Sequence, residues 1–88
     1  MKILKIGAIW CPECLIMRPR WLAIEKEFPW LEMPEVDVDQ QPNFKKEHQI
    51  DHIPTYIFFG QNGEEIFRLK GLVEIDDLKA KILPLKDQ

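Results

Sequence analysis

The sequence predicts an α/β fold: a single domain over residues 1–88, arranged as a three-layer sandwich around a four-stranded mixed sheet. Short strand-like apolar runs alternate with helical patterns, which gives the order β-α-β-α-β-β-α. An Asn-Gly turn signal joins the last two strand-like runs. The hydrophobic fraction of 45% is ordinary for a folded chain, and 88 residues suffice for one small core.

The first strand and the first helix are predicted from a change in apolar spacing. Ile3–Ile9 is an apolar run of strand length, broken by Lys5 and Gly7. We expect the helix to begin at Cys11, because Pro12 then falls in the first turn, where its missing N–H does no harm. Pro19 should kink this helix. Its apolar stripe is spaced at intervals of three and four: Cys14, Met17, Trp21, Ile24 and Phe28.

The middle of the chain continues the alternation. Glu35–Asp39 alternates polar and apolar residues, as a strand does, and Pro42–Gln49 is predicted to form a short second helix. Thr55–Phe59 is a dense run of β-branched and aromatic residues, which is typical of a central strand. Because strands joined through helices pair in parallel by right-handed crossovers, we expect parallel pairing among these three strands.

The C-terminal part is predicted to add a hairpin and a last helix. The Asn-Gly signal at Asn62 leads into a strand over Glu64–Leu69, which should lie antiparallel at the edge of the sheet. A helical spacing follows Gly71, and Pro84 should limit its regular part. The residues that mark this helix are Leu78, Ile82 and Leu85.

The charge pattern and the N-terminal residues lead us to expect that several classes of function do not apply. The net charge of −3, with acidic and basic residues intermixed, leaves no basic stripe for nucleic acid. Met1 precedes only a short apolar run without a small-residue cleavage site, so we expect neither a signal peptide nor a membrane span. We therefore expect a cytoplasmic protein, in which a permanent structural disulfide is rare.

Both cysteines lie in the segment Trp10-Cys11-Pro12-Glu13-Cys14. This spacing allows two thiols in one helical turn to close a disulfide and to open it again. A cysteine at a helix start is favoured as thiolate by the free N–H groups and the positive end of the helix dipole. The pair is thus redox-active or metal-binding, and the spacing alone leaves both open.

A Cys-X-X-Cys at a strand-to-helix junction resembles the thioredoxin superfamily. Trp10, Pro19 and Gly71 fall where that superfamily has a tryptophan, a kinking proline and a substrate-contacting glycine. Two longer matches are Asp39-Gln40-Gln41-Pro42 and Ile53-Pro54-Thr55, the latter at the superfamily's cis-proline motif. These matches span almost the whole chain.

The resemblance implies a thioredoxin-like fold and a thiol–disulfide oxidoreductase that reduces protein disulfides. Cys11, at the helix start and expected nearer the surface, would attack the substrate, and Cys14, expected to be more buried, would resolve the mixed disulfide. The exchange needs no cofactor, but electrons must come from a reductase or a small thiol. We expect a monomer with an apolar docking rim made of Trp10, Pro12, Ile53, Pro54 and Gly71.

Departures from the superfamily's sequence pattern leave two alternative functions open. The dipeptide Pro12-Glu13 differs from the Gly-Pro of thioredoxins and the usual Pro-Tyr of glutaredoxins, and the chain has the shorter length of glutaredoxins. Leu72 after Gly71 breaks the Gly-Gly of a glutathione site, which argues against a glutathione-linked glutaredoxin. A non-enzymatic module that binds metal or a partner is the other alternative.

A zinc site would need the two histidines as well as the cysteines. His48 and His52 are four apart, but 33 residues separate them from Cys14, against about 12–15 in a zinc finger. We therefore expect no metal. His52, two residues before Pro54, could approach the cysteines and assist proton transfer.

The ionisable residues under the cysteines form a reversed pair. Thioredoxins bury an aspartate on the first core strand near a lysine on the neighbouring strand, and Lys5 and Glu35 occupy those positions here. We hypothesise that a charged Lys5 favours thiolate at Cys14 and that Glu35 or neutral Lys5 accepts its proton. The negative charge of Glu13 should disfavour thiolate.

Overall fold

The protein has the element order expected from the sequence, in a computed structural model that describes residues 2–85; residues 1 and 86–88 of the predicted domain lie outside this range. The elements are β1 (Lys2–Gly7), α1 (Pro12–Glu27), β2 (Glu35–Asp37), α2 (Phe44–Glu47), β3 (Thr55–Phe59), β4 (Glu65–Lys70), α3 (Ile75–Ile82) and the 3₁₀ turn η1 (Leu83–Leu85). The second helix is a single turn, shorter than the predicted range Pro42–Gln49. Pro84, which we expect to limit the last helix, lies in η1.

The four strands form one sheet in the order β2-β1-β3-β4, so Thr55–Phe59 is an interior strand as predicted. β1 and β2 are parallel, with Lys5 opposite Glu35, and β3 and β4 form the expected antiparallel hairpin. The expectation of parallel pairing for the third strand is wrong, because β1 and β3 are antiparallel, with Ile6 opposite Thr55.

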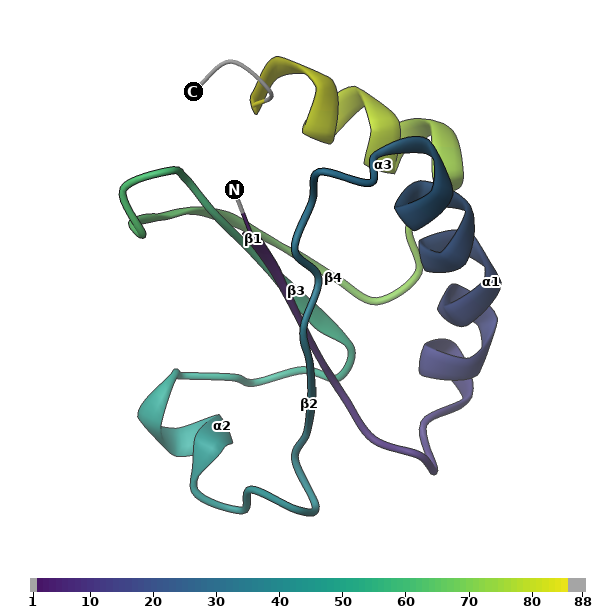
Figure 1. The fold of residues 1–88 in the computed structure, drawn as a ribbon. Coiled ribbons are helices and arrows are strands. Elements are labelled where there is room, and N and C mark those ends of the chain that lie inside the picture. The colour runs from purple at the N-terminus through teal and green to yellow at the C-terminus, as the bar shows by residue number, and fades with distance from the viewer. Residues whose placement is uncertain (1, 86–88) are drawn as a thin grey trace.

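The direction of β3 follows from the shortness of α2. A crossover to a parallel strand must return the chain along the full length of the sheet. α2 has four residues and stays beyond the end of β2, as Figure 1 shows, so the chain enters β3 from the end at which it left β2. The sheet is therefore mixed, with one parallel and two antiparallel pairings.

Each face of the sheet carries its own layer, which makes the predicted three-layer sandwich (Figure 1). α1 and α3 pack together on one face, over Ile3, Tyr56 and Phe58. Ile6 and Ile57, on the opposite face by strand alternation, belong to a second cluster with Phe44 of α2 packed against it.

Helix α1 is held by the predicted apolar stripe. Met17, Trp21 and Ile24 are buried, and Phe28 closes the helix by donating its N–H to Ile24 O at 2.8 Å. The helix continues through Pro19 over 16 residues. The cysteines lie at the N-terminus of this helix, and packing of the stripe fixes their position relative to the sheet.

A buried and an exposed position on α1 test this packing. Ile24 is 0% exposed and Leu22 is 54% exposed. Ile24→Ala should lower the free energy of unfolding by about 2–5 kcal/mol, because it leaves a cavity against the sheet. The matched Leu22→Ala should change it by less than about 0.5 kcal/mol. Urea denaturation measures both, and equal losses in the two variants would contradict the observed packing.

Candidate active site

The cysteine pair lies at the N-terminus of α1. Cys11 is the N-cap residue, in extended conformation, and its Sγ accepts a hydrogen bond from the N–H of Cys14 at 3.2 Å. Pro12 occupies the first helical turn, as predicted. Both cysteines are free thiols. A backbone donor and the helix dipole at this place stabilise a negatively charged sulfur.

The expected order of exposure of the two cysteines is wrong. Cys11 is only 3% exposed and belongs to the cluster around Ile6 and Ala8, whereas Cys14 is half-buried. Cys14 lines a pocket of about 350 Å³ between α1 and the β1–β2 edge, and this opening accounts for its exposure. The capping position, rather than exposure, therefore distinguishes Cys11.

The Cys14 thiol is held in its protonated form. Burial, and after it the hydrogen bond with Cys11, raise its pKa to about 11. The charge of Glu13 adds a smaller upward contribution, in agreement with the sign expected from the sequence. A thiol with a raised pKa must be deprotonated before it can act as a nucleophile.

Gly7 is a residue of the site that the sequence reasoning missed. A Cβ at this position would lie 2.7 Å from Cys14 Sγ, so only glycine lets the end of β1 approach the sulfur this closely. Its position inside a strand-like run was the available signal, because glycine in a strand often marks a close approach.

Lys5 and Glu35 form the predicted reversed pair. Lys5 Nζ lies 3.3 Å from Glu35 Oε1 and 5.9 Å from the centre of the Trp21 ring. The Lys5 side chain is 13% exposed and the Glu35 side chain 69%, so only the lysine is enclosed. Both residues line the pocket that Cys14 also lines. Their effect on Cys14 stays a hypothesis.

The loop before β3 brings Ile53 and Pro54 against the cysteines. The Ile53–Pro54 peptide bond is cis, which confirms the expectation from the resemblance. Ile53 O lies 4.0 Å from Cys11 Sγ, and Pro54 O accepts the N–H of Gly71 at 2.9 Å. Thr55 Oγ1 donates to His52 O. Gly71 has a φ of +73°, a conformation that favours glycine.

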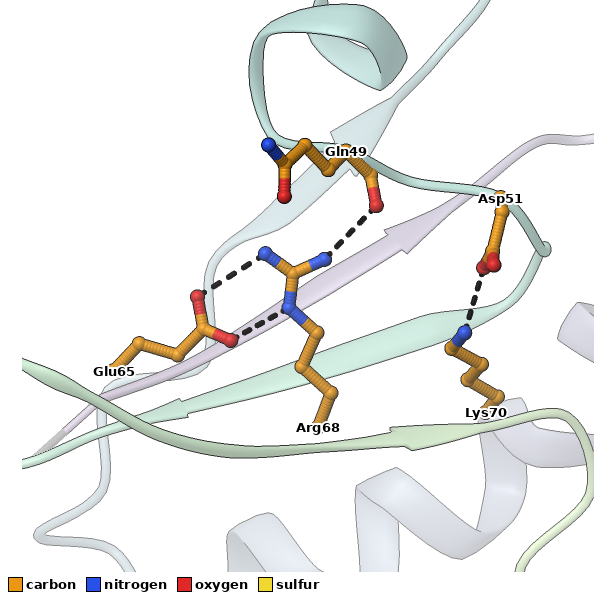
Figure 2. A network of polar contacts seen from close by, with 5 residues as sticks. All are labelled: Gln49, Asp51, Glu65, Arg68 and Lys70. Atoms are coloured by element: carbon orange, nitrogen blue, oxygen red, sulfur yellow. Dashed lines mark hydrogen bonds and ion pairs between the residues drawn. The ribbon is translucent and has the colours of Figure 1, made fainter.

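A polar network fixes this loop to β4 (Figure 2). Arg68 donates to both carboxylate oxygens of Glu65, at 2.6 and 3.1 Å, and to Gln49 O at 3.2 Å. Lys70 Nζ reaches Asp51 Oδ1 at 2.6 Å. The two side chains of β4 thereby hold the segment that leads into the cis bond.

The predicted docking rim comes together around the cysteines. Trp10 is 62% exposed, and its Nε1 donates to Asp39 Oδ2 at 2.6 Å. Pro12 is exposed, Ile53 is half-buried, and Pro54 and Gly71 are buried. Pro54 and Gly71 therefore form the floor of this surface, and Trp10 stands at its edge.

The histidines do not join the cysteines in a metal site. His48 stacks on Phe44 with ring centres 4.1 Å apart, whereas His52 Nε2 lies 3.8 Å from Glu13 Oε1. Within residues 2–85, no three His, Cys, Asp or Glu side chains gather as a metal centre would require. Over the same residues, no helix has the length and apolarity to cross a bilayer.

The dithiol lies at a helix N-terminus, beside a cis-proline loop, on a sheet with the strand order β2-β1-β3-β4. This combination defines a thioredoxin-like protein. A family model described as Thioredoxin matches residues 2–83. This match covers nearly the whole chain, so the chain belongs to the thioredoxin family.

Curated relatives agree with this assignment. Thioredoxin H5 of Oryza sativa is 35% identical over 69 residues, which cover 78% of this chain and 50% of that protein. The H-type thioredoxin of Picea mariana is 31% identical over 78 residues, 89% of this chain and 61% of that protein. The chain thus spans half to three fifths of these relatives. A thioredoxin of Chlamydia trachomatis is 34% identical and is covered over 69% of its length.

Solved structures show the same fold. A thioredoxin of Fasciola hepatica has a TM-score of 0.84 and 29% identity, covering 97% of this chain and 80% of that one. The thioredoxin NaTrxh of Nicotiana alata also has a TM-score of 0.84, with 26% identity, covering 96% of this chain and 71% of that one.

The raised pKa of Cys14 is open to direct titration. In Cys11→Ser, thiolate absorbance should rise with a midpoint above pH 9.0 and no higher than about pH 11, because burial persists while the contribution of Cys11 is lost. Burial disfavours the thiolate, so reduced protein should lose stability relative to Cys14→Ser as the pH rises through this range. A midpoint at or below pH 9.0 would contradict a Cys14 pKa raised by burial.

The same titration tests whether Lys5 influences the ionisation of Cys14. If a charged Lys5 favours the Cys14 thiolate, Lys5→Met in the Cys11→Ser background moves the midpoint to higher pH. An unchanged curve removes Lys5 from the tuning of Cys14.

Proposed function

We propose that this protein is a thiol–disulfide oxidoreductase that reduces disulfides in protein substrates. The observation that carries the proposal is the capped dithiol: Cys11 Sγ at the start of α1 accepts the Cys14 N–H and faces the cis-proline loop. Membership of the thioredoxin family supports the same activity.

The proposed reaction has two exchange steps. The Cys11 thiolate attacks one sulfur of the substrate disulfide, the substrate S–S bond breaks, and the second substrate sulfur leaves as a thiolate that takes up a proton. Cys14 then loses its proton and attacks Cys11 Sγ in the mixed disulfide. This breaks the bond between Cys11 and the attacked substrate sulfur, which leaves as a thiolate and takes up a proton. The Cys11–Cys14 disulfide remains, so two electrons pass from the protein to the substrate.

We propose different tasks for the two cysteines. Cys11 is suited to be the attacking and the leaving sulfur, because its capping position stabilises a thiolate in both roles. Cys14 is suited to wait as a thiol until the mixed disulfide forms, because its pKa is raised to about 11. We propose Glu35, or Lys5 in its neutral form, as the acceptor of the Cys14 proton, since both residues line the pocket on its side.

The substrate segment is proposed to lie along the loop before β3. Among the described residues, no hydrogen bond uses the Ile53 N–H, so this backbone group can pair with an extended substrate chain. Trp10, Pro12, Pro54 and Gly71 then supply the apolar surface on either side. No cofactor takes part in these steps.

Electrons return to the protein by reduction of the Cys11–Cys14 disulfide. We propose a protein reductase or a small thiol as the donor, a monomeric state, and work in the cytoplasm. The relatives found are thioredoxins, which favours this function over a glutathione-linked glutaredoxin. The non-enzymatic alternative, binding of a metal or partner, has no separate observation in its favour.

Reduction of insulin tests the proposed function. With dithiothreitol as donor, the protein should accelerate precipitation of the insulin B chain, and Cys11→Ser should lose this activity completely because the attacking sulfur is gone. Glutathione in place of dithiothreitol tests the glutaredoxin alternative. His48→Ala is the matched control, since His48 stacks on Phe44 away from the cysteines, and it should keep full activity.

Two results would count against the proposal. Wild-type protein that does not accelerate insulin reduction with any dithiol donor would refute a general disulfide reductase. Activity that survives in Cys11→Ser would refute Cys11 as the attacking residue.

A further inference from the structure

Three residues from separate parts of the chain meet beside the dithiol. Glu13 lies between the two cysteines, His52 lies two residues before Pro54, and Gly71 follows β4. Glu13 Oε1 is 3.8 Å from His52 Nε2, and a Cβ at Gly71 would lie 3.3 Å from Glu13 Oε2 and 3.6 Å from His52 Nε2. The carboxylate and the imidazole therefore lie together over Gly71.

This cluster lies on the surface where a substrate is proposed to dock. Gly71 N–H donates to Pro54 O, so the cluster is continuous with the cis-proline loop. The Glu13 side chain is 39% exposed and that of His52 is 48% exposed, so both groups are open to a docked chain. An ion pair this exposed contributes little to stability, so its main effect is on a chain that docks here.

Two further carboxylates lie near the cluster. Asp39 lies at the Trp10 edge of the docking surface, and Asp51 precedes His52. Two cations lie nearby, but each already has a carboxylate partner: Lys70 Nζ pairs with Asp51 at 2.6 Å, and Arg20 lies 3.8 Å from Glu74. Among the described residues, the ion-pair partner of Glu13 is His52 alone, so its negative charge is uncompensated whenever His52 is neutral.

We propose that Glu13 selects disulfide substrates that carry a lysine or arginine next to the attacked cysteine, and that protonation of His52 weakens this selection. The inference rests on the proposed function and names the class of substrate that the same site prefers. A substrate cation placed over Gly71 replaces His52 as the partner of Glu13, whereas a substrate carboxylate there meets like charge.

The pH dependence has a definite sign. The charged groups that face His52 are Glu13 from α1, the adjacent Asp51, and Lys70 of β4 through its pair with Asp51. Histidine changes charge between about pH 5 and pH 8. At the acidic end, an imidazolium 3.8 Å from the carboxylate compensates Glu13, and at the alkaline end Glu13 is left for the substrate. Selection for cationic substrates should therefore increase with pH.

Two model substrates isolate this effect from general reactivity. Each is a short peptide whose single cysteine carries a 2-thiopyridyl disulfide, with lysine on both sides of the cysteine in one peptide and glutamate in the other. Attack by the Cys11 thiolate on the peptide sulfur releases 2-thiopyridone, which is followed by absorbance under single-turnover conditions. Glu13 also affects the Cys14 pKa, but such an effect acts on both peptides alike, so the ratio of their rates reports charge selection.

The ratio of lysine-peptide to glutamate-peptide rates should be greater than one at about pH 8 and should fall towards about pH 5. Glu13→Gln should lower the ratio at about pH 8 by about twofold to fivefold, as expected for one exposed charge pair. His52→Gln, which keeps a polar side chain but does not titrate, should hold the ratio high across this pH range. Glu25→Gln removes an exposed carboxylate from the far part of α1 and should leave the ratio unchanged.

The outcomes separate this inference from the proposed function. If both peptides react and the ratio is the same in wild type, Glu13→Gln and His52→Gln, exchange activity stands and charge selection by Glu13 is wrong. If neither peptide reacts with wild-type protein, the proposed function fails, and the inference fails with it. A ratio that falls equally in Glu25→Gln would assign the preference to net charge and overturn the role of Glu13.

Discussion

The hydrogen bond from the Cys14 N–H to Cys11 Sγ is the interaction around which the site is built. It forms because Cys11 caps α1 in an extended conformation, with Pro12 in the first turn, where no N–H is needed. The buried stripe of α1 fixes the helix on the sheet, and Gly7 lets the end of β1 approach the Cys14 sulfur. The two sulfurs therefore differ in setting: Cys11 Sγ accepts a backbone N–H at the helix N-terminus, whereas burial raises the pKa of Cys14.

The sheet register brings the remaining parts of the site to the same end. Gly7 of β1 is opposite Asp37 of β2, and Thr55 of β3 is opposite Lys70 of β4. The connections that leave the sheet here carry the cysteines, Asp39, the cis-proline loop and Gly71. A fold with β3 antiparallel to β1 places Pro54 beside the cysteines, whereas a parallel β3 would begin at the opposite end.

Much of this could be predicted because it depends on local pattern. Thr55–Phe59 is a strand with the predicted bounds, and the α1 stripe and the cis bond at Pro54 are confirmed. The direction of β3 could not be predicted from alternation, since it depends on how short α2 is. The exposure of the cysteines depends on packing between distant segments. The Glu13–His52 contact joins residues 39 positions apart and has no local signal.

The most direct test of the account is to find which sulfur holds a substrate during exchange. Cys14→Ser protein, incubated with oxidised insulin and quenched with an alkylating agent, should accumulate a mixed disulfide that peptide mass spectrometry places on Cys11. Cys11→Ser protein under the same conditions should accumulate none. A mixed disulfide formed on Cys14 in the Cys11→Ser variant at a comparable rate would contradict the assignment of Cys11 as the attacking sulfur.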